Sequence, residues 1–328
     1  MVVQGKEIYF RGHLVLEHLM KHLLQNTDIE KADKVMLSGC SAGGVATILY
    51  ADYIRSFFDK TEVDFKSVSF SGFFPDASSY DGSPVLYDLV KDVYAMQNVS
   101  SSLNSRCMKD HSGKGKDPHA CFMSQYAYLY VESPIYLVNS VYDAWTVEHI
   151  YNITSQRWKD ASEELKVSML EYLNMQAKAT FDLITNALPW SRSRNGGFLH
   201  TCLTHCGGCC TNQGWDKTVI HGRTLRDSLG DWFFERNINT TTTTTTSSTS
   251  TSTSVSWMLE QATPLPCHWS LSPPYQCNPT CGDEEEDTGF MSFFGEVGQN
   301  IGQMVTSGIQ NATSRMWSEI EGTLQELG

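Results

Sequence analysis

The sequence predicts an α/β fold in which helices flank a mostly parallel β-sheet. Two observations support this prediction. Short apolar segments of strand length alternate along the chain with longer segments in which apolar residues recur at helical spacing. In addition, a glycine-rich hexapeptide, Gly39–Gly44, lies between an apolar segment and a helical one. Strands separated by helices pair in parallel, because each helix returns the chain to the same end of the sheet.

The periodicity locates the individual elements. In residues 13–25, leucines and Met20 recur at helical spacing on one side. In residues 158–187, Leu165, Met169 and Leu173 recur on one side in the same way. The apolar segment 34–38 is short and is expected to be a buried strand. We expect helices at residues 13–25, 46–58 and 158–187, strands at 34–38, 64–70 and 134–139, and a sharp turn at 39–44.

Composition and charge exclude several classes of protein. The chain has 328 residues, 24 Lys+Arg against 37 Asp+Glu, and a formal net charge of −13. No nucleic-acid partner is expected, since such a protein needs a basic face to neutralise phosphates. No apolar run reaches the roughly 18–20 residues that span a membrane, so no integral membrane segment is expected either. Ten cysteines indicate an oxidising compartment.

Changes in composition divide the chain into four parts. Residues 1–238 are predicted to form the globular α/β domain. The Thr/Ser-rich stretch 239–256 has almost nothing apolar to bury, so it is predicted to be a disordered linker. The Cys/Pro-rich segment 257–282 is assigned to the same domain, and 283–328 combines an acidic run with an amphipathic tail. The tail is expected either to dock on a partner or to fray.

The hexapeptide around Ser41 fits the G-x-S-x-G pattern of a nucleophile elbow. In such an elbow the serine lies on a strained turn between a strand and a helix, and Gly39 and Gly43 are expected to avoid steric clashes. The helix that follows directs its N-terminal amides at the oxygen that becomes negative, and the backbone amide of Ala42 is the candidate for this oxyanion hole. The simpler alternative is a structural glycine-rich turn.

Asp143 is the candidate acid. A nucleophilic serine needs a base, and the base needs an acid that orients it. In α/β-hydrolases these groups follow one another as serine, acid and histidine. Asp143 comes just after the predicted strand 134–139, where such folds place their sites. The alternative role for Asp143 is the N-cap of a helix that begins near Thr146.

His205 is the candidate base. His149 is too close to Asp143 in sequence to come from a later strand, and His268 lies beyond the predicted linker. His200 lies inside a short strand, whereas His205 lies at the end of the loop that follows it. The alternative is a structural histidine. The histidines that follow Asp143 are His149, His200, His205, His221 and His268.

Several motifs occur in a fixed order between about residues 6 and 282: Ile8–Gly12, Gly39–Gly44, Gly72–Asp76, Asn139–Trp145, Thr201–Cys206, Gly230–Arg236 and Tyr275–Cys281. Together they resemble the pectin acetylesterase/Notum family of carboxylesterases. The resemblance implies an α/β-hydrolase-like fold. Carried over position by position, it implies that Ser41 is the nucleophile, Asp143 the orienting acid and His205 the general base.

The sequence also departs from this family. Nothing matches the N-terminal section with its Gly-Gly-Trp-Cys loop, which in the family supplies oxyanion-hole amides and part of the sheet. We therefore expect a chain truncated at its N-terminus, with an uncovered strand edge. Phe70-Ser71-Gly72 replaces a motif in which an acidic residue precedes a small residue and glycine, so a supporting contact is expected to be lost.

The cysteines allow disulfides or a metal site. Cys107 and Cys121 are candidates for a staple, and Cys267, Cys277 and Cys281 for pinning the C-terminal segment, although pairing does not follow from sequence. A zinc site is the alternative, but separated C-x₂-C pairs are absent and the family resemblance implies no metal. The candidate ligands are His200, Cys202, His205, Cys206, Cys209 and Cys210.

The leading hypothesis is a serine carboxylesterase without a metal or other cofactor. The family resemblance implies O-acetyl esters of a cell-wall polysaccharide such as pectin as substrate, and a secreted or cell-wall location. The first residues contain no signal-peptide core. The alternatives are a Notum-like protein deacylase and a truncated, catalytically impaired homologue that acts as a binding or scaffold protein. Asn98, Asn152, Asn239 and Asn311 begin glycosylation triplets. Acyl length and oligomeric state stay open.

Overall fold

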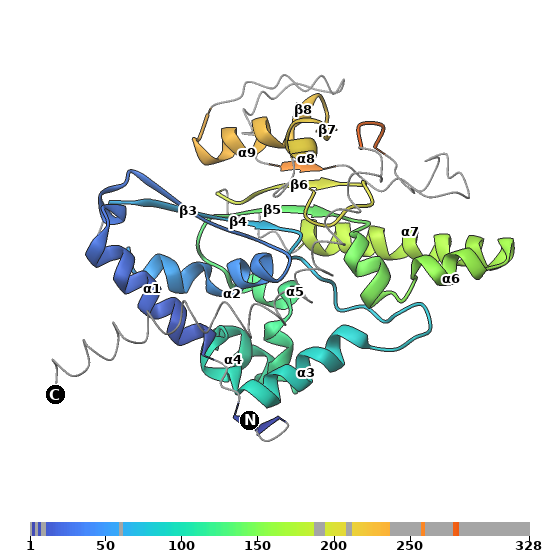
Figure 1. Cartoon of the computed structure of the whole chain (residues 1–328), viewed down its shortest axis with the longest axis horizontal. Coiled ribbons are helices and arrows are strands. Elements are labelled where there is room, and N and C mark those ends of the chain that lie inside the picture. Colours follow the sequence, from blue (N-terminus) through green and yellow to red (C-terminus); the bar gives the residue numbers. More distant parts are fainter. Residues whose placement is uncertain are drawn as a thin grey trace. The chain divides into compact units, whose positions relative to one another are not determined.

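Five strands form a sheet in which every neighbouring pair is parallel (Figure 1). The prediction of an α/β fold with a mostly parallel sheet flanked by helices is confirmed. This computed structural model describes residues 2–3, 6–7, 11–58, 62–186, 194–207, 212–236, 257–259 and 278–281. In spatial order, which is also chain order, the strands are β3 (Lys34–Cys40), β4 (Asp64–Phe70), β5 (Ile135–Ser140), β6 (Gly196–His200) and β9 (Trp257–Leu259).

Helices connect these strands and cover both faces of the sheet (Figure 1). The α-helices are α1 (Gly12–Asn26), α2 (Ala42–Ser56), α3 (Val85–Gln97), α4 (Ser105–Gly113), α5 (Ser124–Ala127), α6 (Ser155–Asp160), α7 (Glu163–Asn186), α8 (Asn212–Asp216) and α9 (Leu225–Phe233). Short 3₁₀ turns are η1 (Ile29–Lys31), η2 (Val99–Ser102), η3 (Pro118–Phe122) and η4 (Tyr128–Tyr130), and η5 (Thr146–Ile150) is a π-helix. Two small antiparallel pairs are β1 (Val2–Val3) with β2 (Lys6–Glu7) and β7 (Val219–Ile220) with β8 (Arg223–Thr224).

The core lies on both faces of the sheet, because successive side chains of a strand point in opposite directions. On one face, Tyr136 and Val138 of β5 pack against α9. On the other face, Ile135 and Leu137 pack in a second cluster with residues of α2 and α7. Because helices cover both faces of the sheet, the segment that becomes β5 is mostly apolar, which made it recognisable as a strand in the sequence.

β3 is an edge strand, which corrects the expectation that it is buried. Within the described residues its only sheet neighbour is β4, and Met36 of β3 is 46% exposed. The helix beside it, α1, also departs from its pattern. Met20 packs in the core with apolar neighbours of α1 and α2, whereas Leu14 and Leu19 are about half exposed. Periodicity locates a helix, but it does not show which apolar residues find a partner.

The predicted boundaries differ most from those observed at two places. β3 extends to Cys40 and α2 begins at Ala42, so the turn predicted at 39–44 consists of Ser41 alone. The helix predicted at 158–187 is two helices, α6 and α7, which are separated where the backbone of Ala161 is extended. The residues around Ala161 are compatible with a helix, so the apolar periodicity did not reveal the break between α6 and α7.

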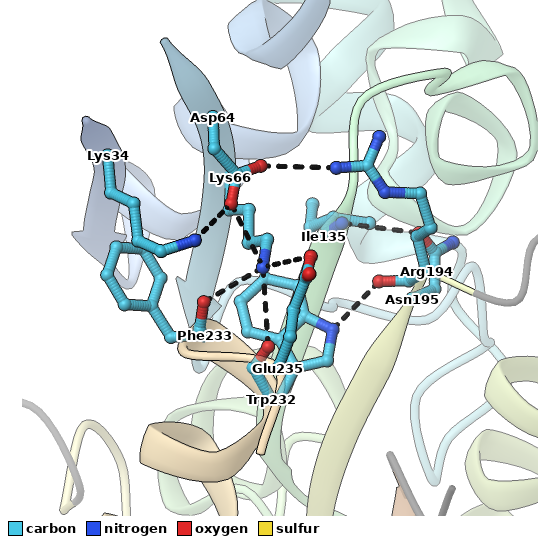
Figure 2. Close-up of polar contacts among 9 residues, drawn as sticks. All are labelled: Lys34, Asp64, Lys66, Ile135, Arg194, Asn195, Trp232, Phe233 and Glu235. Atoms are coloured by element: carbon cyan, nitrogen blue, oxygen red, sulfur yellow. Dashed lines mark hydrogen bonds and ion pairs between the residues drawn. The ribbon is translucent and has the colours of Figure 1, made fainter. Parts of the chain in front are cut away.

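A buried lysine fastens the end of α9 to the sheet (Figure 2). The side chain of Lys66 in β4 is 2% exposed. Its Nζ donates to the carbonyl oxygens of Phe233 at 2.8 Å and Trp232 at 3.4 Å, and it pairs with Glu235 at 2.9 Å. The last carbonyls of a helix lack partners within the helix and carry partial negative charge, so a cation is stabilising there.

Asp64 extends this group into an ion cluster at the amino end of β4 (Figure 2). Its carboxylate lies 3.3 Å from Lys66, 2.6 Å from Lys34 and 3.2 Å from Arg194. Burial alone would raise the pKa of Asp64, but the hydrogen bonds and charges of Lys34 and Lys66 outweigh it and hold the pKa below its ordinary value. We call Lys34, Asp64, Lys66, Arg194 and Glu235 the Lys66 cluster.

The described residues all lie within one compact unit, Met1–Cys281. The predicted linker 239–256 and the acidic tail 283–328 lie outside the described residues. Of the segment 257–282, β9 pairs with β6 and Cys281 is disulfide-bonded to Cys202. Among the described helices, none combines the length and the apolar character that crossing a membrane requires.

Candidate active site

Ser41 lies on a sharp turn between β3 and α2, at the carboxyl end of the sheet. Its backbone has φ 57° and ψ −120°, a conformation that non-glycine residues rarely adopt. Its amide donates to the carbonyl of Phe70 at 2.9 Å, and its carbonyl accepts from Val45 at 3.0 Å. Such a conformation costs about 1–3 kcal/mol and persists only where the surroundings enforce it. This is the strained turn expected of a nucleophile elbow.

Two glycines allow this turn, and one of them is not the residue expected. A Cβ on Gly39 would lie 2.3 Å from the carbonyl oxygen of Gly43, so a side chain is excluded there. A Cβ on Gly43 would meet nothing within 4 Å, which corrects the expected role of this residue. Instead Gly44 is constrained, since its Cβ would lie 2.6 Å from the carbonyl oxygen of Phe70 and 2.8 Å from Gly72. The close approach is therefore between α2 and the end of β4.

The structure brings Ser41, His205 and Asp143 together, as expected from the sequence. His205 Nε2 is 2.8 Å from Ser41 Oγ, and His205 Nδ1 is 2.7 Å from Asp143 Oδ2. If the Asp143 carboxylate is ionised it can only accept, so Nδ1 carries the proton and Nε2 accepts from the serine hydroxyl. His205 and Asp143 are 6% and 4% exposed, whereas Ser41 is only partly buried. We call these three residues the triad.

Asp143 makes the contacts that both of the roles considered for it require. One carboxylate oxygen accepts from His205, and the other accepts from the backbone amide of Thr146 at 2.9 Å and from its hydroxyl at 3.0 Å. The second set of contacts is made to Thr146, the first residue of the π-helix η5, and caps the helical turn that begins directly after Asp143. The cap holds the carboxylate still, so the two roles reinforce each other.

Aromatic side chains surround the imidazole. The rings of Phe74 and Trp145 pack edge to face with centroids 5.1 Å apart, and they lie 6.1 and 6.3 Å from the ring of His205. Phe74 follows β4 and Trp145 follows Asp143, so two of the sequence motifs meet here. These rings form an apolar flank that limits the access of water to the base.

The other candidate histidines lie elsewhere. Burial of His200 at the end of β6 lowers its pKa to about 4, against a smaller opposing effect of the Asp143 charge, and its Nδ1 accepts from the amide of Cys202. His149 is exposed and packs on Trp145, and His221 contacts the carbonyl of Leu259. His268 lies outside the described residues.

Ala42 keeps its place as the candidate for the oxyanion hole. It is the first residue of α2 and is exposed. Because the first amides of a helix have no acceptor within it, the Ala42 N–H is available to a ligand at the helix N-terminus. The role is the one that geometry assigns to the residue after a nucleophilic serine.

Three disulfides occur among the described residues: Cys40–Cys206, Cys107–Cys121 and Cys202–Cys281. The expected staple Cys107–Cys121 is present. Cys202 and Cys206 are excluded as zinc ligands, because zinc binds thiolates and the sulfur atoms of a disulfide are not thiolates. Cys209 and Cys210 lie outside the described residues. Cys107 and Cys121 also lie near His111, but their bond to each other likewise removes them as ligands.

Sequence reasoning missed two contacts that hold the loop around His205. The hydroxyl of Ser71 accepts from the backbone amide of Cys206 at 2.9 Å, and Cys206 is bonded to Cys40. Ser71 lies next to Phe70, which stands where the family has an acidic residue, and the loss of a contact from that position stays a prediction. The adjacency of cysteines to both Ser41 and His205 was a sequence signal for the disulfide, but it did not establish the pairing.

A sequence model described as pectinacetylesterase matches residues 1–281. Pectin acetylesterase 5 of Arabidopsis thaliana is 28% identical over 71% of this chain and 54% of its own length. Pectin acetylesterase 4 of the same plant is 29% identical over 70% of this chain and 56% of its own length. The chain therefore spans little more than half the length of these relatives.

More distant proteins share the fold. The palmitoleoyl-protein carboxylesterase NOTUM of Schmidtea mediterranea is 23% identical over 69% of this chain and 41% of its own length. A solved structure of the Wnt deacylase Notum from Drosophila superposes with a TM-score of 0.59 at 20% identity, covering 71% of this chain and 62% of that chain. The expected α/β-hydrolase-like fold is thereby confirmed.

Proposed function

Because the chain belongs to the pectinacetylesterase family, a family of carboxylic ester hydrolases, we propose that it is a serine carboxylesterase that works through an acyl-enzyme. The observation that supports this most is the imidazole of His205, which is hydrogen-bonded to Ser41 Oγ at 2.8 Å and to Asp143 Oδ2 at 2.7 Å. A base that contacts both a hydroxyl and a buried carboxylate is the arrangement that acyl transfer requires.

In the first half of the reaction, Ser41 is acylated. Its Oγ forms a bond to the ester carbonyl carbon while its proton passes to His205 Nε2. The charged oxygen of the tetrahedral intermediate accepts from the Ala42 amide. The intermediate then collapses, the bond to the leaving alcohol breaks, and that alcohol takes the proton from Nε2. Asp143 stabilises the imidazolium without becoming protonated.

In the second half, water releases the acid. Its oxygen forms a bond to the acyl carbon while one of its protons passes to Nε2 of His205, and the bond from that carbon to Ser41 Oγ breaks as Oγ regains the proton. The apolar flank of Phe74 and Trp145 shields the imidazole, so its contacts to Asp143 and Ser41 are stronger than they would be in water.

The proposed substrate class is O-acetyl esters of a cell-wall polysaccharide such as pectin. Identity is higher to the pectin acetylesterases, at 28 and 29%, than to the NOTUM carboxylesterase of Schmidtea mediterranea, at 23%. A secreted location is supported by the three disulfides, since these persist in oxidising compartments.

The test compares Ser41→Ala with the matched control Ser38→Ala, which changes an exposed serine on the same strand. With p-nitrophenyl acetate, we expect kcat to fall at least about 10³-fold for Ser41→Ala and to stay unchanged for Ser38→Ala. Equal rates for wild type and Ser41→Ala would remove Ser41 from the mechanism.

The substrate class needs a second measurement. Esters of acetate, octanoate and palmitate are compared, together with acetate release from acetylated pectin. We expect kcat/KM to be highest for acetate and the polymer to be deacetylated. A preference for palmitate would favour a protein deacylase of the Notum type instead.

A further inference from the structure

A disulfide joins the residue that precedes Ser41 to the residue that follows His205. Cys40 is the last residue of β3 and Cys206 lies in the loop after β6, and their Cα atoms are 6.0 Å apart. β3 and β6 are not neighbours in the sheet, because β4 and β5 lie between them. The bond therefore ties together two elements that the sheet itself keeps apart.

The loop after β6 reaches β3 by crossing the carboxyl ends of the intervening strands. Thr204 accepts from the backbone amide of Ala144, which follows β5, at 3.3 Å. Cys206 then donates its amide to the hydroxyl of Ser71, which follows β4, at 2.9 Å. At the end of β3, Cys206 is bonded to Cys40. His205 lies between these attachments, so the place of its ring depends on how the far end of the crossing is held.

We propose that the Cys40–Cys206 disulfide is a positioning bond that holds the imidazole of His205 within reach of Ser41 Oγ, an inference that rests on the proposed serine esterase activity. Ser41 and Cys206 have φ values of 57° and 62°, in the left-handed region. Such backbone persists where the surrounding structure over-determines it. A covalent link between Cys40 and Cys206 constrains both turns at once. Without it, the crossing relaxes and the 2.8 Å contact between Nε2 and Oγ lengthens.

The chain offers a matched control for this bond. Cys107–Cys121 is a buried disulfide that joins α4 to η3, and neither cysteine adjoins a triad residue in sequence. Both bonds are expected to stabilise the fold, and Cys40–Cys206 the more, because it closes a span of 166 residues against 14. The free energy of unfolding therefore does not distinguish a positioning bond from a purely structural one, whereas kcat does.

The experiment compares Cys40→Ala/Cys206→Ala with Cys107→Ala/Cys121→Ala, at a temperature where circular dichroism shows both to be folded. With p-nitrophenyl acetate, we expect the first pair to lower kcat about 10²-fold with little change in KM, since a displacement of about 1 Å has this effect on a catalytic group. The control pair should keep the wild-type kcat. A folded Cys40→Ala/Cys206→Ala protein with wild-type kcat would overturn the proposal.

A spectroscopic signature separates this proposal from the esterase proposal. In wild type, the buried Nδ1 proton of His205 that is shared with Asp143 should give a downfield proton NMR resonance, assigned by its loss in His205→Gln. We expect this resonance to disappear in Cys40→Ala/Cys206→Ala and to persist in the control pair. Its persistence in both would contradict positioning, even if the wild type hydrolyses nothing. Absence of Ser41-dependent hydrolysis in wild type would instead contradict the esterase proposal alone.

If Cys40→Ala/Cys206→Ala does not fold, the bond is opened in the native protein. A water-soluble phosphine is titrated, free thiols are alkylated, and mass spectrometry reports which disulfide has opened. We expect activity to fall in proportion to opening of Cys40–Cys206 and to return on re-oxidation. Full activity in folded protein whose Cys40–Cys206 bond is open would overturn the proposal.

Discussion

Two groups of polar side chains, the Lys66 cluster and the triad, lie near opposite ends of the sheet and differ in how their members are paired. At the amino end of β4, Lys66 is 2% exposed and contacts two carboxylates and two carbonyls, so its charge is compensated. At the carboxyl ends, the triad presents a partly exposed hydroxyl on a strained turn, hydrogen-bonded to a base. The first arrangement compensates a buried charge, whereas the second holds a serine in strained backbone beside a histidine.

This difference predicts that the two groups respond to mutation in opposite ways. Substitutions in the triad should lower kcat. They should leave the free energy of unfolding nearly unchanged, because the triad has only three members and each is held by nearby contacts. Changes in the Lys66 cluster should lower the free energy of unfolding and leave kcat unchanged. A variant of the Lys66 cluster that lowered kcat as well as the free energy of unfolding would show that the two ends of the sheet are coupled.

The largest effect is expected for Asp143→Asn. The oxygen that faces Thr146 keeps its contacts, but an amide facing Nδ1 favours the tautomer that carries the proton on Nε2. With the wrong tautomer facing Ser41, kcat for p-nitrophenyl acetate should fall about 10⁴-fold, while urea unfolding should be almost unchanged. A kcat within tenfold of wild type would show that Asp143 only caps η5.

The elbow is tested by Gly39→Ala with Gly43→Ala as the control. A Cβ at Gly39 would lie 2.3 Å from backbone, so we expect a loss of about 2 kcal/mol in the free energy of unfolding and about 10²-fold in kcat. A Cβ at Gly43 meets nothing, and alanine favours a helix, so this variant should be about 0.5–1 kcal/mol more stable. Similar losses for both would contradict the clash at Gly39.

His200 makes stability depend on pH. Burial lowers its pKa to about 4 from the ordinary 6.5, so between these values the unfolded chain binds a proton that the folded chain does not. The free energy of unfolding should therefore decrease as the pH falls from 6.5 to 4, by about 3 kcal/mol from this residue. His200→Gln should remove this part of the decrease in urea unfolding, whereas the exposed His149→Gln should not. Parallel curves for wild type and His200→Gln would refute the assignment.

The smallest effect is expected in the Lys66 cluster. Lys66→Met keeps the stem but removes the donor to Trp232 and Phe233, so the free energy of unfolding should fall by about 2 kcal/mol. Glu235→Gln changes a carboxylate that is 62% exposed and should cost no more than about 0.5 kcal/mol. Both variants should keep the wild-type kcat once folded, which distinguishes this end of the sheet from the triad.

The sequence predicted the main elements and the three residues of the triad. Segments 34–38 and 134–139, which correspond to β3 and β5, were recognisable because they are mostly apolar. Segment 64–70, which corresponds to β4, was recognisable because it alternates between polar and apolar residues and ends in Phe70. Ser41, Asp143 and His205 could be chosen because each follows the carboxyl end of a predicted strand, and in a parallel sheet those ends meet at one edge. Their catalytic roles remain a prediction that the variants above test.

The amino-acid sequence by itself therefore determined which segments become strands and helices. It also determined which side chains gather at the carboxyl edge of the sheet, since local patterns of apolar and glycine residues encode these features. Only the tertiary structure decided the pairing of Cys40 with Cys206, the hydrogen bond between Cys206 and Ser71, and the constraint at Gly44. Each of these depends on which distant segment packs next to a residue. That proximity is a property of the folded chain, because contacts between residues remote in sequence have no local pattern that records them.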